Sequence, residues 1–112
     1  YAICLDMIAD KNPSFPIEYF SYVQAPTLVN EIWTLANDLG YDEFKKNIVA
    51  PIYDDHRALY LNSYIPAIDI IDFDYPFWHT LDDIPENCSE ATLKIVGNVI
   101  SEFIYRQDYE NR

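Results

Sequence analysis

Two short apolar segments constrain the fold of this chain more than any other feature. Residues 1–8 (YAICLDMI) are apolar except for Asp6, and residues 66–72 (PAIDIID) form a second run that is rich in isoleucine. Apolar runs of this length are typical of strands that are covered on both faces, as in a parallel sheet. Helical patterns separate and follow the two runs, so the order of elements predicts an α/β fold with a mostly parallel sheet.

The helices that would cover this sheet are expected from apolar residues at helical spacing. A sheet buried on both faces needs helices on both sides, which predicts a three-layer α/β/α sandwich. Only the first and last helices are strongly patterned, so the sandwich is expected to be partial. Residues 1–112 are therefore expected to be the C-terminal part of a single domain, cut from a longer polypeptide. The expected helices span residues 26–39, 54–62 and 89–106.

Local sequence signals predict the ends of these elements. Pro26 suits a first helical turn, Gly40 a helix stop, and Asp54 or Asp55 the N-cap of the middle helix. Ser89 is the expected N-cap of the last helix. Residues 10–16 are expected to form turns because Pro13 and Pro16 oppose regular structure, and residues 41–52 to form a loop with a short extended piece.

The last helix also carries an expectation about packing. Gly97 lies beside its apolar stripe, so a neighbouring element is expected to approach closely there. The residues expected in that stripe are Leu93, Val96, Ile100, Phe103 and Ile104.

The charge of the chain excludes several classes of partner. It has 19 acidic and 7 basic residues, a net charge of −12, which opposes binding to nucleic acid or to an anionic membrane surface. The same field favours cations, including metal ions, although excess acidic residues also simply keep a protein soluble. Cys4 and Cys88 show no metal-binding spacing and are expected to be two ordinary thiols, with Cys4 buried.

Asp6 and His79 are the residues that stand out against this background. A carboxylate within an apolar strand is costly unless it is paired, hydrogen-bonded or bound to a metal. His79 follows the second strand in a loop that contains Pro76 and large aromatic rings. Because the carboxyl ends of parallel strands meet at one edge of a sheet, both side chains are expected there and would supply half of a zinc site. The alternatives are an exposed strand-end Asp6 and a structural His79.

Asp54, Asp55 and His56 form a second polar group. Adjacent acidic residues at a helix start are most often an N-cap, and neighbouring side chains on a helix diverge by about 100°. One carboxylate that supports a metal ligand without touching the metal is the functional alternative. Nucleophile elbows, phosphate-binding loops and other common catalytic motifs are absent from the sequence.

Three motifs in order resemble the C-terminal part of the M28 zinc exopeptidases, a family that also contains the glutaminyl cyclases. They are LDMI at 5–8, IYDDH at 52–56 and WHTLDD at 78–83. The resemblance covers roughly residues 3 to 105. It implies a zinc-exopeptidase-like fold, one or two zinc ions in the complete protein, and a peptide substrate.

The resemblance also implies roles for four residues. His79 would bind zinc, and Asp6 would bind zinc in the two-zinc peptidases or join a hydrogen-bonded acidic network in the one-zinc cyclases. Asp55 would be a catalytic acidic group near the substrate, and Trp78 would line the substrate pocket. The family's upstream ligands and its Glu-Glu pair, which includes the general base, do not occur in these 112 residues.

The function implied is that of a zinc-dependent aminopeptidase, of which this fragment alone is expected to be inactive. A glutaminyl cyclase that forms pyroglutamate, and a non-catalytic binding module on the same fold, are the alternatives. The resemblance further implies a secreted or periplasmic protein. The fragment is expected to self-associate, or to need the absent N-terminal part, through an exposed apolar patch.

Overall fold

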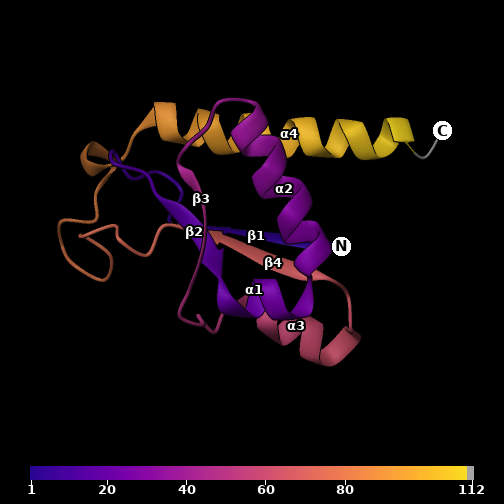
Figure 1. Cartoon of the computed structure of the whole chain (residues 1–112). Coiled ribbons are helices and arrows are strands. Elements are labelled where there is room, and N and C mark those ends of the chain that lie inside the picture. The colour runs from indigo at the N-terminus through magenta and orange to yellow at the C-terminus, as the bar shows by residue number, and fades with distance from the viewer. Residues whose placement is uncertain (111–112) are drawn as a thin grey trace.

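The computed structural model describes residues 1–110, with side chains described through Gln107, and it confirms the expected α/β architecture. Helices α2 and α4 lie on one side of the strands, and α1 and α3 lie on the other (Figure 1). The elements are β1 Ala2–Asp6, β2 Phe15–Glu18, α1 Tyr19–Gln24, α2 Pro26–Asp38, β3 Phe44–Val49, α3 Asp55–Ser63, β4 Ala67–Ile71, the 3₁₀ turn η1 Pro85–Asn87 and α4 Glu90–Glu110.

The strands pair in parallel, as the sequence predicts. β1 pairs with β4, so that Cys4 lies opposite Asp69 and Asp6 lies opposite Ile71. β2 pairs with β3, and β2 also packs against β4. The last residues of β1 and β4 therefore lie side by side at one edge, where ligands bind in parallel α/β sheets.

An aromatic cluster between α2 and the β2–β3 pair anchors the core. Trp33 is 1% exposed, and its ring meets Phe44 edge-on with centroids 5.4 Å apart. Phe15 packs against Phe44 at 5.2 Å, and the Trp33 indole N–H donates to the Phe15 carbonyl at 3.0 Å. This bond satisfies the one polar atom of the buried indole, so the cluster holds β2 firmly at its start.

The expected helix ends agree with the structure. The Asp54 side chain accepts from the Asp55 N–H and caps α3, and Gly40 follows α2 with a φ of 92° that a side chain would disfavour. The Ser89 hydroxyl accepts from the Thr92 N–H at the start of α4. The extended piece expected within 41–52 is β3.

The prediction of turns over 10–16 was wrong at its C-terminal end. β2 begins at Phe15 and includes Pro16, and α1 follows directly. The pairing register with β3 shifts between Phe15 and Ile17, so Pro16 lies at an irregular position where its missing N–H costs no ladder bond.

Three packing expectations were also wrong. β1 is only partly covered, because β4 is its only partner among the described residues, and Cys4 is only half-buried. Leu93 and Ile104 are about half exposed, whereas Thr92 and Val99 join Val96 and Phe103 on the buried face of α4. Among the described residues, no neighbouring element places an atom within 4 Å of the position that a Cβ on Gly97 would take.

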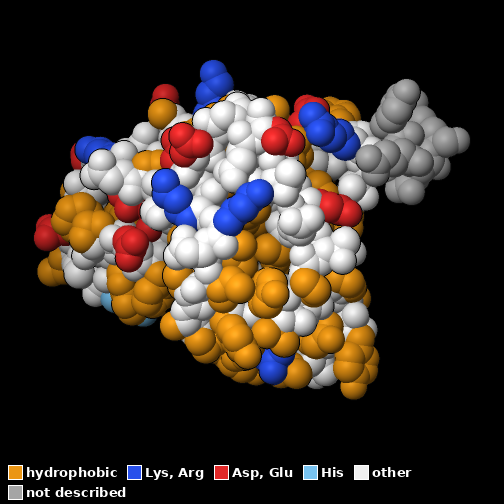
Figure 2. All heavy atoms as spheres, viewed as in Figure 1, with side chains coloured by type: hydrophobic (Ala, Val, Ile, Leu, Met, Phe, Trp, Pro, Cys, Tyr) orange, Lys and Arg blue, Asp and Glu red, His pale blue; other side chains and the backbone are white. Residues whose placement is uncertain are grey.

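Exposed apolar side chains gather over α1 and α3, at the lower end of the molecule in Figure 2. They include Tyr19, Tyr22 and Val23 of α1 and Leu59 and Leu61 of α3, each more than a third exposed. None of the helices described, from α1 to α4, is long and apolar enough to cross a membrane.

Candidate functional site

Asp6 lies where the sequence predicts, at the carboxyl edge of the sheet. It is the last residue of β1, its side chain is exposed, and its backbone is in register with the end of β4. The next residue, Met7, has a φ of 51°, an uncommon left-handed conformation that ends the strand abruptly. The strand therefore presents the Asp6 carboxylate at its tip and turns the chain away behind it.

His79 lies in the loop that leaves β4, and its own backbone is strained. Its φ is 59°, and the turn around it is closed by the Thr80 N–H and hydroxyl, which both donate to the Phe77 carbonyl. Such conformations in residues other than glycine cluster at functional sites. The imidazole is exposed and packs on Trp78, with ring centroids 4.2 Å apart. A free imidazole fixed in this way can accept a metal ion.

Trp78 belongs to a row of aromatic rings beside the site. It is 36% exposed, and its ring lies 5.1 Å from that of Phe73. Phe73 in turn lines an apolar pocket of about 460 Å³, whose other residues are Pro16, Val49, Ala50, Pro51, Ile52, Tyr53 and Asp74. That Trp78 lines the substrate pocket stays a prediction. An apolar pocket does lie next to it, on the other side of Phe73.

Three carboxyl groups gather at the edge of the sheet. Asp69 of β4 is fully buried, and burial together with the carboxyls of Asp54 and Asp6 raises its pKa to about 8. Burial and the hydrogen-bonded Asp54 carboxyl also raise the pKa of Asp6. These three residues are termed the acidic cluster here, and their mutual proximity disfavours the charged forms of Asp6 and Asp69.

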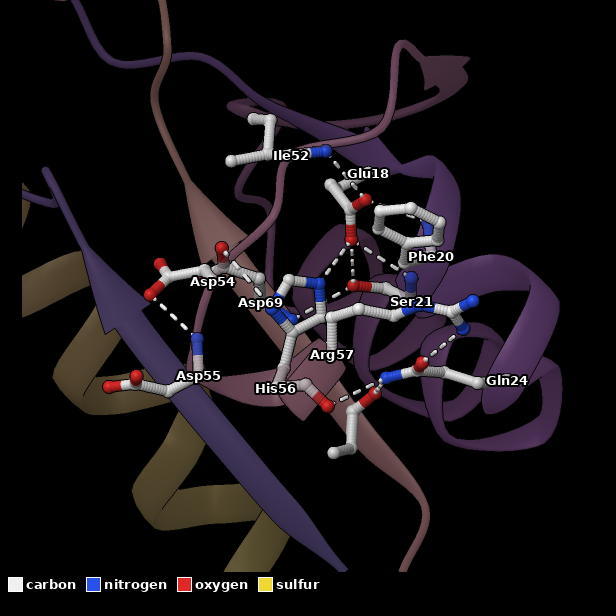
Figure 3. Close-up of polar contacts among 11 residues, drawn as sticks. Glu18, Phe20, Ser21, Gln24, Ile52, Asp54, Asp55, His56, Arg57 and Asp69 are labelled. Atoms are coloured by element: carbon white, nitrogen blue, oxygen red, sulfur yellow. Dashed lines mark hydrogen bonds and ion pairs between the residues drawn. The ribbon is translucent and has the colours of Figure 1, made fainter. Parts of the chain in front are cut away.

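The member of the DDH motif in this cluster is Asp54. Asp55 is exposed, and its carboxylate points away from His56 and Glu18 (Figure 3). The two neighbours diverge because one is the N-cap and the other begins the helix. The catalytic role of Asp55 stays a prediction, and of the two carboxyls Asp54 does more than Asp55 to raise the pKa of Asp6.

A fully buried set of polar side chains lies behind the acidic cluster, and sequence reasoning missed it. His56 Nε2 lies 2.7 Å from Glu18 Oε1, and His56 Nδ1 lies 3.7 Å from Asp69 Oδ2 (Figure 3). All three side chains are 0% exposed. Asp69 could have been found, because it interrupts an apolar strand just as Asp6 does. Glu18 lies in a segment where no strand or helix was expected.

The residues of this chain fit part of a zinc site. Among the side chains that the structure describes, which end at Gln107, no three from His, Cys, Asp or Glu are arranged so that they could hold one metal ion by themselves. The imidazole of His79 is a suitable zinc ligand. The acidic cluster places carboxyl groups against one another, a repulsion that a nearby cation would relieve. A complete zinc shell would need further ligands from outside these residues.

Comparison with known proteins agrees with the motifs. The profile of peptidase family M28 matches residues 1–104 of this chain. The chain belongs to that family, which confirms the resemblance seen in the three motifs.

Individual relatives include both cyclases and exopeptidases. The chain is 27% identical to the glutaminyl-peptide cyclotransferase of Boiga dendrophila, over 91% of this chain and 30% of that protein. The Porphyromonas gingivalis glutaminyl cyclase superimposes with a TM-score of 0.89 at 33% identity, over 95% of this chain and 42% of the other. A Zn-dependent exopeptidase from Parabacteroides distasonis gives 0.90 at 38% identity, over 94% and 39%. The chain thus spans less than half the length of these relatives.

Proposed function

We propose that residues 1–112 form the C-terminal part of the single catalytic domain of a zinc-dependent enzyme that acts on the N-terminal residue of peptides, and that its reaction is glutaminyl cyclisation. The observation that carries this choice is the acidic cluster, in which burial and the neighbouring carboxyls raise the pKa of both Asp6 and Asp69. Asp6 is engaged with the Asp54 carboxyl, which suits a member of a proton-holding network better than a free metal ligand.

In the proposed reaction the N-terminal amine of a glutamine attacks its own side-chain amide carbon. A carbon–nitrogen bond forms, the bond to the amide nitrogen breaks, and ammonia leaves after a proton has moved from the amine to that nitrogen. A bound zinc ion would polarise the amide carbonyl. His79 Nε2 or Nδ1 would hold the metal, and the Asp54 and Asp69 carboxyl oxygens would hold and pass the proton.

The remaining residues of the site would bind the substrate. Trp78 and Phe73 offer an aromatic wall, and the 460 Å³ pocket beside them suits an apolar side chain further along the peptide. Together they would orient the N-terminal residue and exclude water, which matters because water would otherwise compete with the amine.

An aminopeptidase is the second candidate, favoured by the likeness to the Parabacteroides distasonis exopeptidase. In that case Asp6 would bind zinc as well, and water would replace the internal amine as the nucleophile. Incubating the complete gene product, loaded with zinc, with a peptide Gln-Leu-Ala and identifying the products separates the two. Pyroglutamyl-Leu-Ala with ammonia supports cyclisation, and free glutamine supports the aminopeptidase. An intact peptide would contradict both and leave a binding module.

The isolated 112-residue chain is proposed to be inactive, because the described residues supply no complete metal-binding group. Turnover of the same peptide by this chain alone would contradict that statement. The exposed apolar side chains of α1 and α3 support the expectation that the fragment self-associates. Export to the periplasm or the medium is proposed from the family resemblance, and fractionation of cells that produce the protein tests it.

A further inference from the structure

Glu18 has a set of contacts that its place in the sequence does not explain. It is fully buried at the end of β2, and its carboxylate accepts five hydrogen bonds. Three come from its own neighbourhood, from the N–H groups of Phe20 and Ser21 and from the Ser21 hydroxyl. These cap α1, and the cap alone does not require the other two bonds.

The other two bonds reach the connection between β3 and α3. The Ile52 N–H donates to Glu18 Oε2 at 3.0 Å, and His56 Nε2 lies 2.7 Å from Glu18 Oε1 (Figure 3). Between these two contacts stand only residues 53–55, which include Asp54 of the acidic cluster. The Glu18 carboxylate therefore forms hydrogen bonds with the chain on both sides of Asp54.

Glu18 also reaches Asp69 by two routes. His56 presents its second ring nitrogen to the Asp69 carboxyl at 3.7 Å. The Ser21 hydroxyl, which donates to Glu18, accepts from the Asp69 N–H at 2.9 Å. The segment that carries Asp54 and the strand that carries Asp69 are thus both tied to the same buried side chain.

We infer that Glu18 is a positioning residue, which fixes Asp54 and Asp69 for proton transfer and fixes Ile52 in the wall of the substrate pocket. This inference rests on the proposed function, because it gives those residues their roles. Its physical basis is that a carboxylate only accepts hydrogen bonds and here faces only donors. Glutamine has the same size but turns an NH₂ group toward one pair of these donors.

The test compares Glu18→Gln with Glu31→Gln, a matched change on the exposed side of α2, in the zinc-loaded complete gene product. Glu18→Gln is expected to raise KM and to lower kcat/KM by about 10- to 100-fold, the range found when the support of a site is removed. Its zinc content should stay unchanged, and Glu31→Gln should match the wild type in every respect. A loss of activity that equals the loss of folded, zinc-loaded protein, with kcat and KM unchanged per folded chain, would report only lost folded protein and would overturn the inference.

A second readout does not depend on activity and separates this inference from the proposed function. Amide hydrogen exchange should become faster in residues 50–57 of Glu18→Gln, while α2 keeps its wild-type protection. If the wild type turns over no peptide, the proposed function fails and the exchange result alone decides whether Glu18 holds this segment. Unchanged exchange in residues 50–57 would overturn the inference.

Glu18→Asp provides a second variant in case Glu18→Gln does not fold. It keeps the charge but shortens the side chain by one methylene, so it cannot reach Ile52 and His56 together. The same local gain in exchange is expected. Failure of both variants to fold would assign Glu18 to folding alone and would also overturn the inference.

Discussion

Glu18 and Asp69 face the same histidine from opposite ring nitrogens, yet their pKa values move in opposite directions. Both side chains are fully buried, which by itself raises the pKa of a carboxyl group. At Glu18 the hydrogen bonds from His56, Ile52, Phe20 and Ser21 outweigh burial and lower the pKa to about 2. At Asp69 the pKa rises to about 8.

The opposite pKa shifts of Glu18 and Asp69 come from their neighbouring groups, because the two side chains are equally buried. Neither oxygen of Asp69 accepts a bond from an N–H or O–H donor of the described residues, and its nearest polar neighbours include the carboxyls of Asp54 and Asp6. A carboxylate surrounded by donors is part of the framework, whereas a carboxyl surrounded by carboxyls keeps a proton available. The two kinds of carboxyl group, Glu18 and Asp69, lie on opposite sides of the His56 ring.

Removing the framework carboxylate should have the largest effect. Glu18→Ala leaves five donors without their acceptor, three of them in buried hydrogen bonds, and should lower the free energy of unfolding by about 3–5 kcal/mol. Urea denaturation of the complete gene product measures this, with Glu31→Ala as a control expected within about 0.5 kcal/mol of wild type. A loss below about 1 kcal/mol would show that the donors find other partners.

Substitutions in the acidic cluster should lower activity rather than stability. Asp54→Asn should lower kcat/KM about 100-fold, the size of a general acid–base contribution, while Asp55→Asn should change it less than about fivefold. Steady-state kinetics on both variants makes the measurement. The reverse order would support the role that the sequence resemblance gave to Asp55.

Asp72 offers a test of shared protons away from the proposed metal. It is fully buried, and burial with a hydrogen bond to the Asp10 carboxyl raises its pKa to about 7, against 3.8 for an ordinary Asp. The folded state holds this proton more tightly than the unfolded state. Its contribution to stability is therefore complete below pH 4 and is lost as pH rises through 7.

Asp72→Asn should remove this part of the pH dependence, at most about 4 kcal/mol between pH 4 and pH 8. Urea midpoints of wild type and variant across that range, in the complete gene product, provide the measurement. Parallel pH profiles for the two proteins would show that the folded state does not raise the pKa of Asp72.

The smallest effect on stability is expected at Asp69. At pH 7 its carboxyl is mostly protonated, so Asp69→Asn replaces one neutral group by another of the same shape and should change stability by less than about 1 kcal/mol. Thermal unfolding of the zinc-free protein is the appropriate measurement. A loss as large as that of Glu18→Ala would mean that Asp69 is ionised and paired with His56.

The sequence predicted the elements whose signals are local. β1, β4, α2, α3 and α4 follow from apolar runs, helical spacing and caps such as Asp54, Gly40 and Ser89. β2 and α1 were missed because Pro16 normally opposes a strand. Its tolerance depends on a register shift against β3, which lies 28 residues further along and is set only in the fold.

The residues of the candidate site also fall into those that the sequence could predict and those that it could not. Asp6 and His79 could be proposed because Asp6 ends β1 and His79 lies in the loop that leaves β4, and parallel pairing brings the ends of these two strands together. The choice between Asp54 and Asp55 could not, since it depends on which residue caps α3 and which carboxyl then meets Asp6. Glu18 could not be foreseen either, because its partners Ile52 and His56 are distant in sequence.

The most direct test of the account is the zinc content of the complete gene product after loading with excess zinc and dialysis. One zinc ion is expected per wild-type chain, none in His79→Ala, and a full complement in His56→Gln if that variant is folded by circular dichroism. Full zinc in a folded His79→Ala would contradict the central claim, because His79 would then be only a strained aromatic neighbour of Trp78.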